Sequence, residues 1–224
     1  MNIGGFVKNS FVDYPGNIAA VIFTVGCNMK CWYCHNKHLL GYSNKQAEVE
    51  ILDFLSSHSD FLDGVVISGG EPTLQPDLKE FILKIREFGL KIKLDTNGTN
   101  FEVLKDLVDN KLIDYVAMDI KAPLDKYEMI TKTKDDMISI RNSIDFLLSN
   151  VIDYEFRTTY SPDLTSEDIE ELCKTIAGAK RYAIQRYRVP EGEQVVMMQR
   201  KATDHDEAKA VANKYIKDVI LRGM

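Results

Sequence analysis

Three cysteines lie within a span of eight residues, at Cys27, Cys31 and Cys34. A structural zinc site is normally closed by four protein ligands, whereas an iron–sulfur cluster is held by cysteine thiolates on its irons. Three thiolates on a four-iron cluster leave one iron open to a reacting molecule. The spacing therefore indicates a cluster that takes part in chemistry as well as in electron transfer.

Two other uses of these cysteines remain open. Zinc would need a fourth ligand, and the nearest histidines are His35 and His38. His35 directly follows Cys34, and adjacent residues rarely reach the same ion, whereas His38 could reach it from a helical turn. A disulfide framework is weaker, because the chain is long and has only four cysteines. The fourth, Cys173, lies on the apolar face of an expected helix over Ile169–Ile176, so we expect it in the core.

The composition limits the classes of function. A chain of 224 residues with 45% hydrophobic residues can bury a substantial core in one domain. The net charge of −6 argues against nucleic acid as a dedicated partner. No apolar run approaches the roughly 20 residues of a membrane span, and the first residues do not resemble a signal peptide. We therefore expect a cytoplasmic protein, in a compartment that keeps thiolates reduced.

The elements that must position these cysteines alternate between strand and helix patterns. Helical periodicity separates six expected strands, and Thr165 followed by Asp168 predicts a helix start. The alternation predicts parallel βαβ units. The six expected strands are Ala19–Val25, Val65–Ser68, Lys91–Thr96, Tyr115–Ile120, Tyr154–Thr159 and Arg181–Gln185.

We expect one α/β domain over residues 1–224, built as an open, partial (β/α)6 barrel of parallel strands. Residues 1–18 are expected to form an extended arm with a turn at Asp13–Gly16. The barrel is expected over residues 19–190. A last helix over residues 203–222 is expected to carry its apolar side chains, from Ala208 to Ile220, on its inner face.

Polar residues and glycines follow the expected strands. In parallel α/β folds the loops at the carboxyl ends of the strands build the active site. The sequence therefore predicts that these residues meet at one rim of the sheet. They are Cys27 to Cys34 after the first strand, Ser68 to Pro72 at the end of the second, Asp95 to Gly98 at the third, Asp119 to Lys121 at the fourth, Arg157 in the fifth, and Gln185 to Arg188 at the end of the sixth.

Several of these residues have both a structural and a functional interpretation. Asp95 and Asp119 suit turn and capping roles, or else a cationic ligand, a ribose hydroxyl or a monovalent cation. Lys121, two residues beyond Asp119, would share its face of a strand and could neutralise a ligand carboxylate. If Arg157 points inward it must meet an anion, because an unpaired buried guanidinium is costly; a structural ion pair is the alternative.

The cysteine triad with the Gly69–Glu71 segment resembles the radical S-adenosylmethionine (SAM) enzymes over roughly residues 10–190. The resemblance implies a 4Fe–4S cluster on Cys27, Cys31 and Cys34, with SAM bound to the open iron. Reductive cleavage of SAM would then give methionine and a 5′-deoxyadenosyl radical. The protein's part in such chemistry is to position the cofactors.

Within this superfamily the Cys31–Asn36, Asp95–Gly98 and Asp119–Lys121 segments are similar to those of the glycyl-radical-enzyme activases. The Asp13–Gly16 segment and the compact length are most similar to the activating proteins of anaerobic ribonucleoside-triphosphate reductase, with the pyruvate formate-lyase activases as relatives. The cofactor-binding residues that the resemblance implies are Tyr33, His35, Gly69, Gly70, Glu71, Asp95, Asn97, Asp119, Lys121 and Arg157.

One position departs from the pyruvate formate-lyase activases, which carry a SAM-contacting histidine at the end of the last barrel strand. Here the stretch is Gln185–Arg188, without histidine, and Tyr187 or Arg188 is the candidate replacement. This difference weakens the assignment to pyruvate formate-lyase itself. The chain also has no second cysteine cluster, which argues against activases with an inserted ferredoxin-like domain.

We therefore expect a radical SAM activase that generates a glycyl radical on a partner enzyme, most of all anaerobic ribonucleoside-triphosphate reductase. The alternatives are a pyruvate formate-lyase activase, a small-molecule enzyme such as a 7-carboxy-7-deazaguanine synthase-like protein, and a non-enzymatic electron-carrying or zinc-binding module. The electron donor is expected to be an acidic flavodoxin or ferredoxin that docks at Lys30 and Lys37.

Overall fold

The computed structural model describes residues 1–41, 46–134, 136–189 and 204–223, which form one eight-stranded sheet. The strands are hydrogen-bonded in chain order from β1 to β8, with β1 antiparallel to β2 and all later neighbours parallel. They are β1 (Ile3–Ser10), β2 (Ala19–Thr24), β3 (Gly64–Gly69), β4 (Lys91–Thr96), β5 (Tyr115–Asp119), β6 (Asp153–Tyr160), β7 (Tyr182–Arg186) and β8 (Val219–Arg222).

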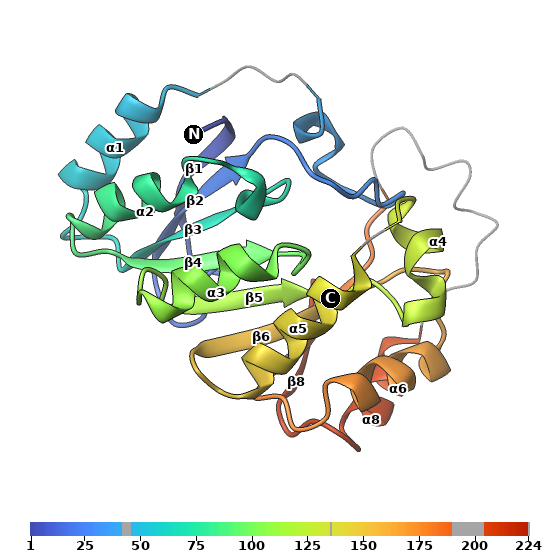
Figure 1. Ribbon diagram of the computed structural model, residues 1–224. Helices are drawn as coiled ribbons and strands as arrows, with labels where there is room; N and C mark the ends of the chain where they lie inside the picture. Colours follow the sequence, from blue (N-terminus) through green and yellow to red (C-terminus); the bar gives the residue numbers. More distant parts are fainter. Residues whose placement is uncertain (42–45, 135, 190–203, 224) are drawn as a thin grey trace.

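The helices cover one face of this sheet and leave the other face to the site (Figure 1). Because β1 and β8 are the two edge strands, the sheet is open, as predicted. None of the helices in the described part of the chain is both long and apolar enough to cross a membrane. The helices are α1 (Glu48–Ser57), α2 (Leu78–Arg86), α3 (Phe101–Asp109), α4 (Tyr127–Thr131), α5 (Met137–Leu148), α6 (Ser166–Thr175) and α8 (His205–Ala212), with 3-10 turns at Lys37–Leu39, Pro72–Leu74 and Leu124–Lys126.

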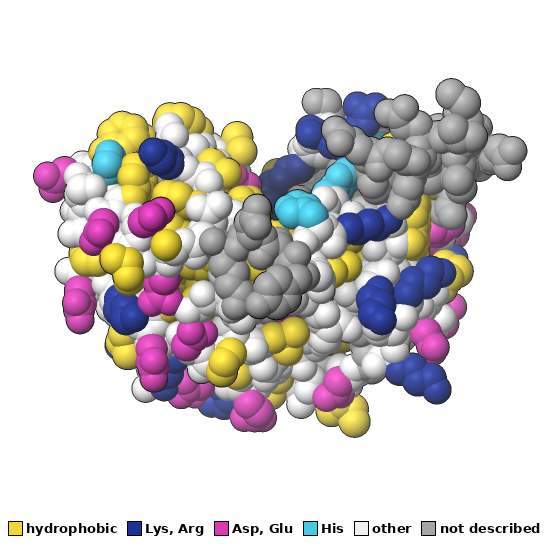
Figure 2. All heavy atoms as spheres, turned by 90° about the horizontal axis from the view of Figure 1, so that it is seen from above, with side chains coloured by type: hydrophobic (Ala, Val, Ile, Leu, Met, Phe, Trp, Pro, Cys, Tyr) yellow, Lys and Arg dark blue, Asp and Glu magenta, His cyan; other side chains and the backbone are white. Residues whose placement is uncertain are grey.

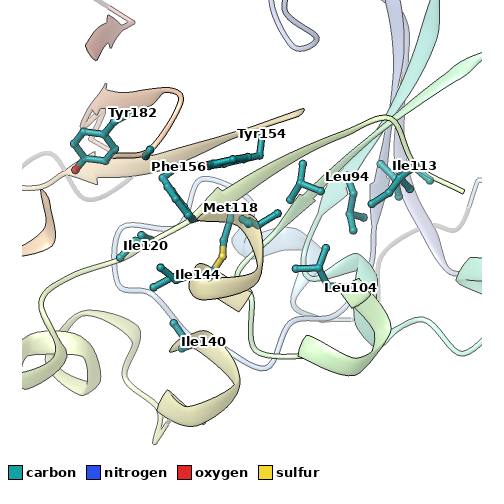
Figure 3. Close-up of a cluster of buried hydrophobic side chains, with 14 of the residues drawn as sticks. Leu94, Leu104, Ile113, Met118, Ile120, Ile140, Ile144, Tyr154, Phe156 and Tyr182 are labelled. Atoms are coloured by element: carbon teal, nitrogen blue, oxygen red, sulfur yellow. The ribbon is translucent and has the colours of Figure 1, made fainter. Parts of the chain in front are cut away.

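The main core lies between the sheet and the helices. Figure 3 shows strand residues such as Leu94, Met118 and Phe156 facing Leu104 of α3 and Ile144 of α5. Each such side chain stabilises the fold by about 1.5–3 kcal/mol when it is fully buried. Since strand side chains alternate between faces, the neighbours of these residues project onto the opposite, inner face of the sheet.

The inner face changes character along the strands. Near the start of the parallel strands it is apolar, where Tyr14 of the N-terminal arm packs with Val21 and Val66 and lies against Tyr115, with ring centroids 5.9 Å apart. Toward the carboxyl ends of the strands it carries charged side chains instead. The arm thus closes one end of the inner face and leaves the other end for the site.

The predicted start of α6 is confirmed. Thr165 Oγ1 accepts a hydrogen bond from the Asp168 amide, and the Asp168 carboxylate accepts one from the Thr165 amide at 2.7 Å. This capping box satisfies two backbone donors and typically contributes about 1 kcal/mol. The helix buries Cys173 completely, which confirms the core prediction for the fourth cysteine.

All six predicted strands are present, each with bounds within about a residue of the prediction. The predicted turn is also present, because the Asn17 amide donates to the Tyr14 carbonyl at 3.1 Å and Gly16 takes a positive φ of 73°. The arm is more than an extended segment, however. Residues Ile3–Ser10 pair with β2 and add an antiparallel edge strand to the sheet.

The predicted helix over residues 203–222 is wrong beyond Ala212, and its first residue, like residue 190 at the predicted end of the barrel, lies outside the described residues. Val219–Arg222 instead forms β8, which pairs in parallel with β7. Two interactions favour the strand over the helix that the periodicity predicts. The segment pairs with the open edge of the sheet, and Arg222 makes a bidentate contact with buried Glu155, at 2.6 Å for each bond.

Candidate active site

The cysteine loop follows β2 and is fixed to the body of the protein by its backbone. The Lys30 amide donates to the Thr131 carbonyl at 2.8 Å, and the Trp32 amide donates to the Ile130 carbonyl at 3.4 Å. Cys31 is buried, whereas Cys27 and Cys34 are half-buried, and no disulfide joins any of the described cysteines. The loop therefore presents its three thiols from a backbone that is already ordered.

Two N–H groups point at the sulfur of Cys27. The Met29 amide lies 3.4 Å from Cys27 Sγ, and the side-chain amide of Asn97 lies 3.9 Å from it. Burial raises the pKa of the Cys27 thiol to about 11, although the Met29 amide opposes the shift. Hydrogen bonds to cluster sulfurs are one of the means by which proteins set a cluster's reduction potential.

The end of β3 lies directly against the start of the cysteine loop. The Gly70 amide donates to the Thr24 carbonyl at 2.9 Å, and the Glu71 amide donates to the Gly26 carbonyl at 2.8 Å. A Cβ on Gly70 would lie 2.0 Å from the Gly26 oxygen, and Gly69 has a positive φ of 110°. Only glycine fits this approach, so the two glycines are already needed to bring β2 and β3 together.

Glu71 holds the next strand's loop in place. Its buried carboxylate accepts hydrogen bonds from the hydroxyls of Thr73 and Thr96, at 2.6 and 2.8 Å, and from the Asn97 amide at 2.7 Å. Burial raises the pKa of Glu71, while these hydrogen bonds oppose the shift. All of these contacts are to protein groups, and the predicted contact of Glu71 with SAM stays a prediction.

Five charged side chains form a continuous chain across the inner face of β4, β5 and β6. Lys93 contacts Asp95, and Arg157 then bridges Asp95 through Nη1 at 3.1 Å and Asp119 through Nε at 2.8 Å. Lys121 Nζ completes the chain at 3.0 Å from Asp119. The predicted need of Arg157 for an anion, and the predicted shared face of Asp119 and Lys121, are both confirmed.

This charged chain holds three cations and two anions, so it carries one net positive charge. Burial alone would raise the pKa of Asp119, but the charges of Arg157 and Lys121 outweigh it and hold that pKa well below its usual range. Asp95 is held low in the same way by Arg157 and Lys93. The excess positive charge suits a ligand that carries a carboxylate.

An aromatic group packs behind the cysteine loop. The ring of Tyr187 lies 5.5 Å from Trp32 and 6.4 Å from Tyr33, centroid to centroid. The Tyr33 hydroxyl is buried and has no hydrogen-bond partner among the described residues. Tyr187 therefore packs beside the loop, and the residue of β7 that reaches the cavity is Gln185.

One cavity of about 290 Å³ connects these parts, and every residue predicted for the site lines it. The structure thus brings together the three cysteines and the ten predicted cofactor-binding residues, although their contacts with cofactors stay predictions. Six further polar residues line the cavity that were not among the predicted site residues, although Ser68 and Gln185 were expected at the same rim because they end strands. The six are Asp13, Asn36, Ser68, Thr96, Thr159 and Gln185.

The lining residues fit a thiolate-held cluster and a zwitterionic ligand beside it. The cluster would be held by Cys27, Cys31 and Cys34, which the loop presents to the cavity. The Tyr33 hydroxyl and the net positive charge of the charged chain are unsatisfied features that a polar, anionic group would satisfy. Within the described ranges no three His, Cys, Asp or Glu side chains are placed to hold a single metal ion.

Sequence comparison finds relatives along nearly the whole chain. Residues 21–176 match the radical SAM superfamily. A protein of Methanocaldococcus jannaschii, provisionally named a glycyl-radical enzyme activating enzyme, is 41% identical over 233 residues, which cover 98% of this chain and 95% of the relative. A pyruvate formate-lyase-activating enzyme of Clostridium pasteurianum is 37% identical over 129 residues, 54% of this chain and 52% of the relative.

Structural comparison supports the same fold. SuiB of Streptococcus suis, solved with bound S-adenosylmethionine, superposes with a TM-score of 0.70 over 91% of this chain and 50% of SuiB, at 16% identity. A domain of a pyruvate-formate lyase-activating enzyme from Bacteroides vulgatus superposes with a TM-score of 0.55 over 71% of this chain and 99% of that domain, at 15% identity. At such low identities these superpositions show a shared fold.

Proposed function

Because the chain belongs to the radical SAM superfamily, we propose that it is an activating enzyme that generates a glycyl radical on a partner enzyme. The observation that carries the proposal is the meeting, in one cavity, of the cysteine loop, the Gly69–Gly70 end of β3 and the charged chain. The relative of M. jannaschii supports it, because that protein is similar over nearly its whole length.

The superfamily implies a 4Fe–4S cluster and SAM, which when bound would supply the 5′-deoxyadenosyl radical that removes a hydrogen atom from the substrate. Cys27, Cys31 and Cys34 would hold the cluster. The side-chain amide of Asn97 and the backbone amide of Met29 would donate to the Cys27 sulfur. These hydrogen bonds would stabilise the reduced, more negative state of the cluster.

The charged chain would orient SAM. Lys121 and Arg157 would bind its carboxylate, since they belong to a chain with one excess positive charge. The Tyr33 hydroxyl would donate to a polar group of the ligand and so gain the partner that it lacks. Fixing both ends of SAM keeps its sulfonium in one orientation, which is the protein's main contribution to such a reaction.

The proposal includes a monovalent cation beside Asp95 and Asp119, whose carboxylates are hard oxygen donors. Arg157 bridges the same two carboxylates, so the ion and the guanidinium would compete for them. SAM cleavage that is unchanged when K⁺ is replaced by tetramethylammonium would count against the ion.

We propose anaerobic ribonucleoside-triphosphate reductase as the partner. The Asp13–Gly16 segment supports this choice, whereas the similarity to the pyruvate formate-lyase-activating enzyme of C. pasteurianum extends over about half of the chain. A flavodoxin or ferredoxin is the proposed electron donor, because Lys30 and Lys37 are exposed beside the cysteine loop.

Anaerobic EPR spectroscopy tests the function. Reconstituted protein, dithionite, SAM and the host's anaerobic reductase subunit should give a glycyl-radical doublet that needs both SAM and this chain. No doublet, with 5′-deoxyadenosine still formed, would reject the reductase as partner and leave pyruvate formate-lyase or a small-molecule substrate. No 5′-deoxyadenosine would reject the radical chemistry itself.

A further inference from the structure

Two consecutive large apolar side chains are exposed on the N-terminal arm. Phe11 is 68% exposed and Val12 is 80% exposed. Val7 of β1 is also partly exposed, and it pairs with Val21, whose side chain lies on the inner face of the sheet. Directly paired residues of an antiparallel ladder share a face, so Val7 lies on the inner side. We call Val7, Phe11 and Val12 the arm patch.

The arm is ordered although its apolar side chains are exposed. Ser10 Oγ donates to the Asp13 carboxylate at 2.6 Å and accepts from the amides of Val12 and Asp13 at 3.2 and 3.3 Å. Buried Tyr14 then anchors the arm on the sheet. These hydrogen bonds fix the backbone around Phe11 and Val12, which reduces the ordering cost when a partner covers the two side chains.

Phe11 and Val12 of the arm patch directly precede a residue of the cavity wall in the chain. Asp13, the residue after Val12, lines the same cavity as Cys27, Cys34 and Arg157. β1 is also an edge strand, and among the described residues no strand joins it to β8 across the open side of the sheet. Figure 2, a view from above, shows an indentation at the margin of the molecule. A segment lying on the arm patch would therefore have a short path into the cavity.

We propose that the arm patch docks the glycine-bearing polypeptide segment of the partner enzyme and guides it into the cavity. This inference rests on the proposed function, because the occupant is the protein substrate of that reaction. A polypeptide suits the surface, since apolar side chains can cover Phe11 and Val12 while backbone amides meet the Asp13 carboxylate at the cavity wall. A small-molecule substrate would have no use for an apolar surface outside the cavity.

The test compares two double variants that remove the same kind of exposed surface. Phe11→Ser with Val12→Ser alters the arm patch. Val49→Ser with Ile138→Ser is the matched control, because those side chains are 68% and 75% exposed on α1 and α5. None of the four side chains is buried, so both variants are expected to fold.

The measurement is the concentration of the host's anaerobic reductase subunit that gives half-maximal glycyl-radical signal. We expect the arm variant to raise this concentration by about tenfold or more, which is the effect of truncating the few residues that dominate an interface. The control variant should match the wild-type chain. Formation of 5′-deoxyadenosine without the reductase should be equal in all three proteins.

The outcomes separate this inference from the proposed function. A wild-type doublet with equal half-saturation in both variants would overturn the docking role alone. No wild-type doublet with either the reductase or pyruvate formate-lyase would overturn the proposed function, and this occupant with it. An arm variant that changes the sedimentation coefficient of the chain by itself would assign the arm patch to self-association and overturn the inference.

Discussion

Arg157→Met should destabilise the protein far more than the loss of an ordinary surface ion pair. Methionine keeps most of the side-chain volume, so the change chiefly removes the charge that bridges Asp95 and Asp119. The Arg157 side chain is 11% exposed, and it is the central member of the charged chain. Removing one partner of a buried ion pair costs about 3–5 kcal/mol, because it leaves an uncompensated buried charge.

The lower end of that range applies, since Lys93 still contacts Asp95 and Lys121 still contacts Asp119. A loss of about 3 kcal/mol should lower the midpoint of thermal unfolding by about 6–12 °C for a chain of this size. The assay is anaerobic thermal unfolding followed by circular dichroism, on reconstituted protein and again after removal of the cluster with a chelator. A decrease present in both states belongs to the protein rather than to cluster loss.

Arg181→Met is the control. Arg181 pairs with Asp218 at 2.7 Å, a distance similar to those in the charged chain, but the two side chains are 35% and 42% exposed. Exposed pairs contribute about 0–1 kcal/mol, so the midpoint should fall by no more than about 4 °C. If Arg157→Met lowered the midpoint no more than Arg181→Met does, Arg157 would not be the buried bridge described above.

The other predictions concern the cofactors. Cys31→Ala should lose the intact cluster and all SAM cleavage, measured by EPR and by 5′-deoxyadenosine formation, whereas Cys173→Ala should keep both because Cys173 is a core residue; loss of the cluster in the second variant would show that the cysteines are wrongly sorted. Lys121→Ala should weaken SAM binding with the cluster preserved, in a titration of SAM against the EPR signal of the reduced cluster. The double change Lys30→Glu with Lys37→Glu should slow reduction by flavodoxin but not by dithionite, and equal slowing with both reductants would argue against a docking role.

The parallel strands were predictable because their local pattern and their tertiary context agree. In each of the six, apolar residues either follow one another or alternate with polar ones over a short stretch, and at least one face is buried. The C-terminal segment was not predictable in this way. Ala208 to Ile220 keep a helical spacing, but the open edge of β7 offers Val219 and Ile220 backbone partners that no local pattern encodes.

The site could be predicted residue by residue, but not as an arrangement. The position of Asp95, Asp119 and Lys121 at strand ends follows from the order of elements. That Arg157 bridges both carboxylates depends on the side-by-side registers of β4, β5 and β6, in which Asp95 pairs with Ala117 and Asp119 pairs with Arg157. The spacing of residues in the sequence does not determine those strand registers.

The glycines at the end of β3 show how fold and chemistry can share one residue. A role for Gly70 in binding the cofactor was expected from the resemblance to the radical SAM enzymes. The structure shows that the fold itself requires glycine at position 70, because a Cβ there would collide with the Gly26 carbonyl, next to Cys27. A Gly70→Ala variant would therefore displace the cysteine loop whether or not Gly70 contacts SAM. Loss of activity in that variant cannot by itself assign Gly70 to the cofactor, whereas the cluster's EPR signal without SAM reports the displacement of the loop directly.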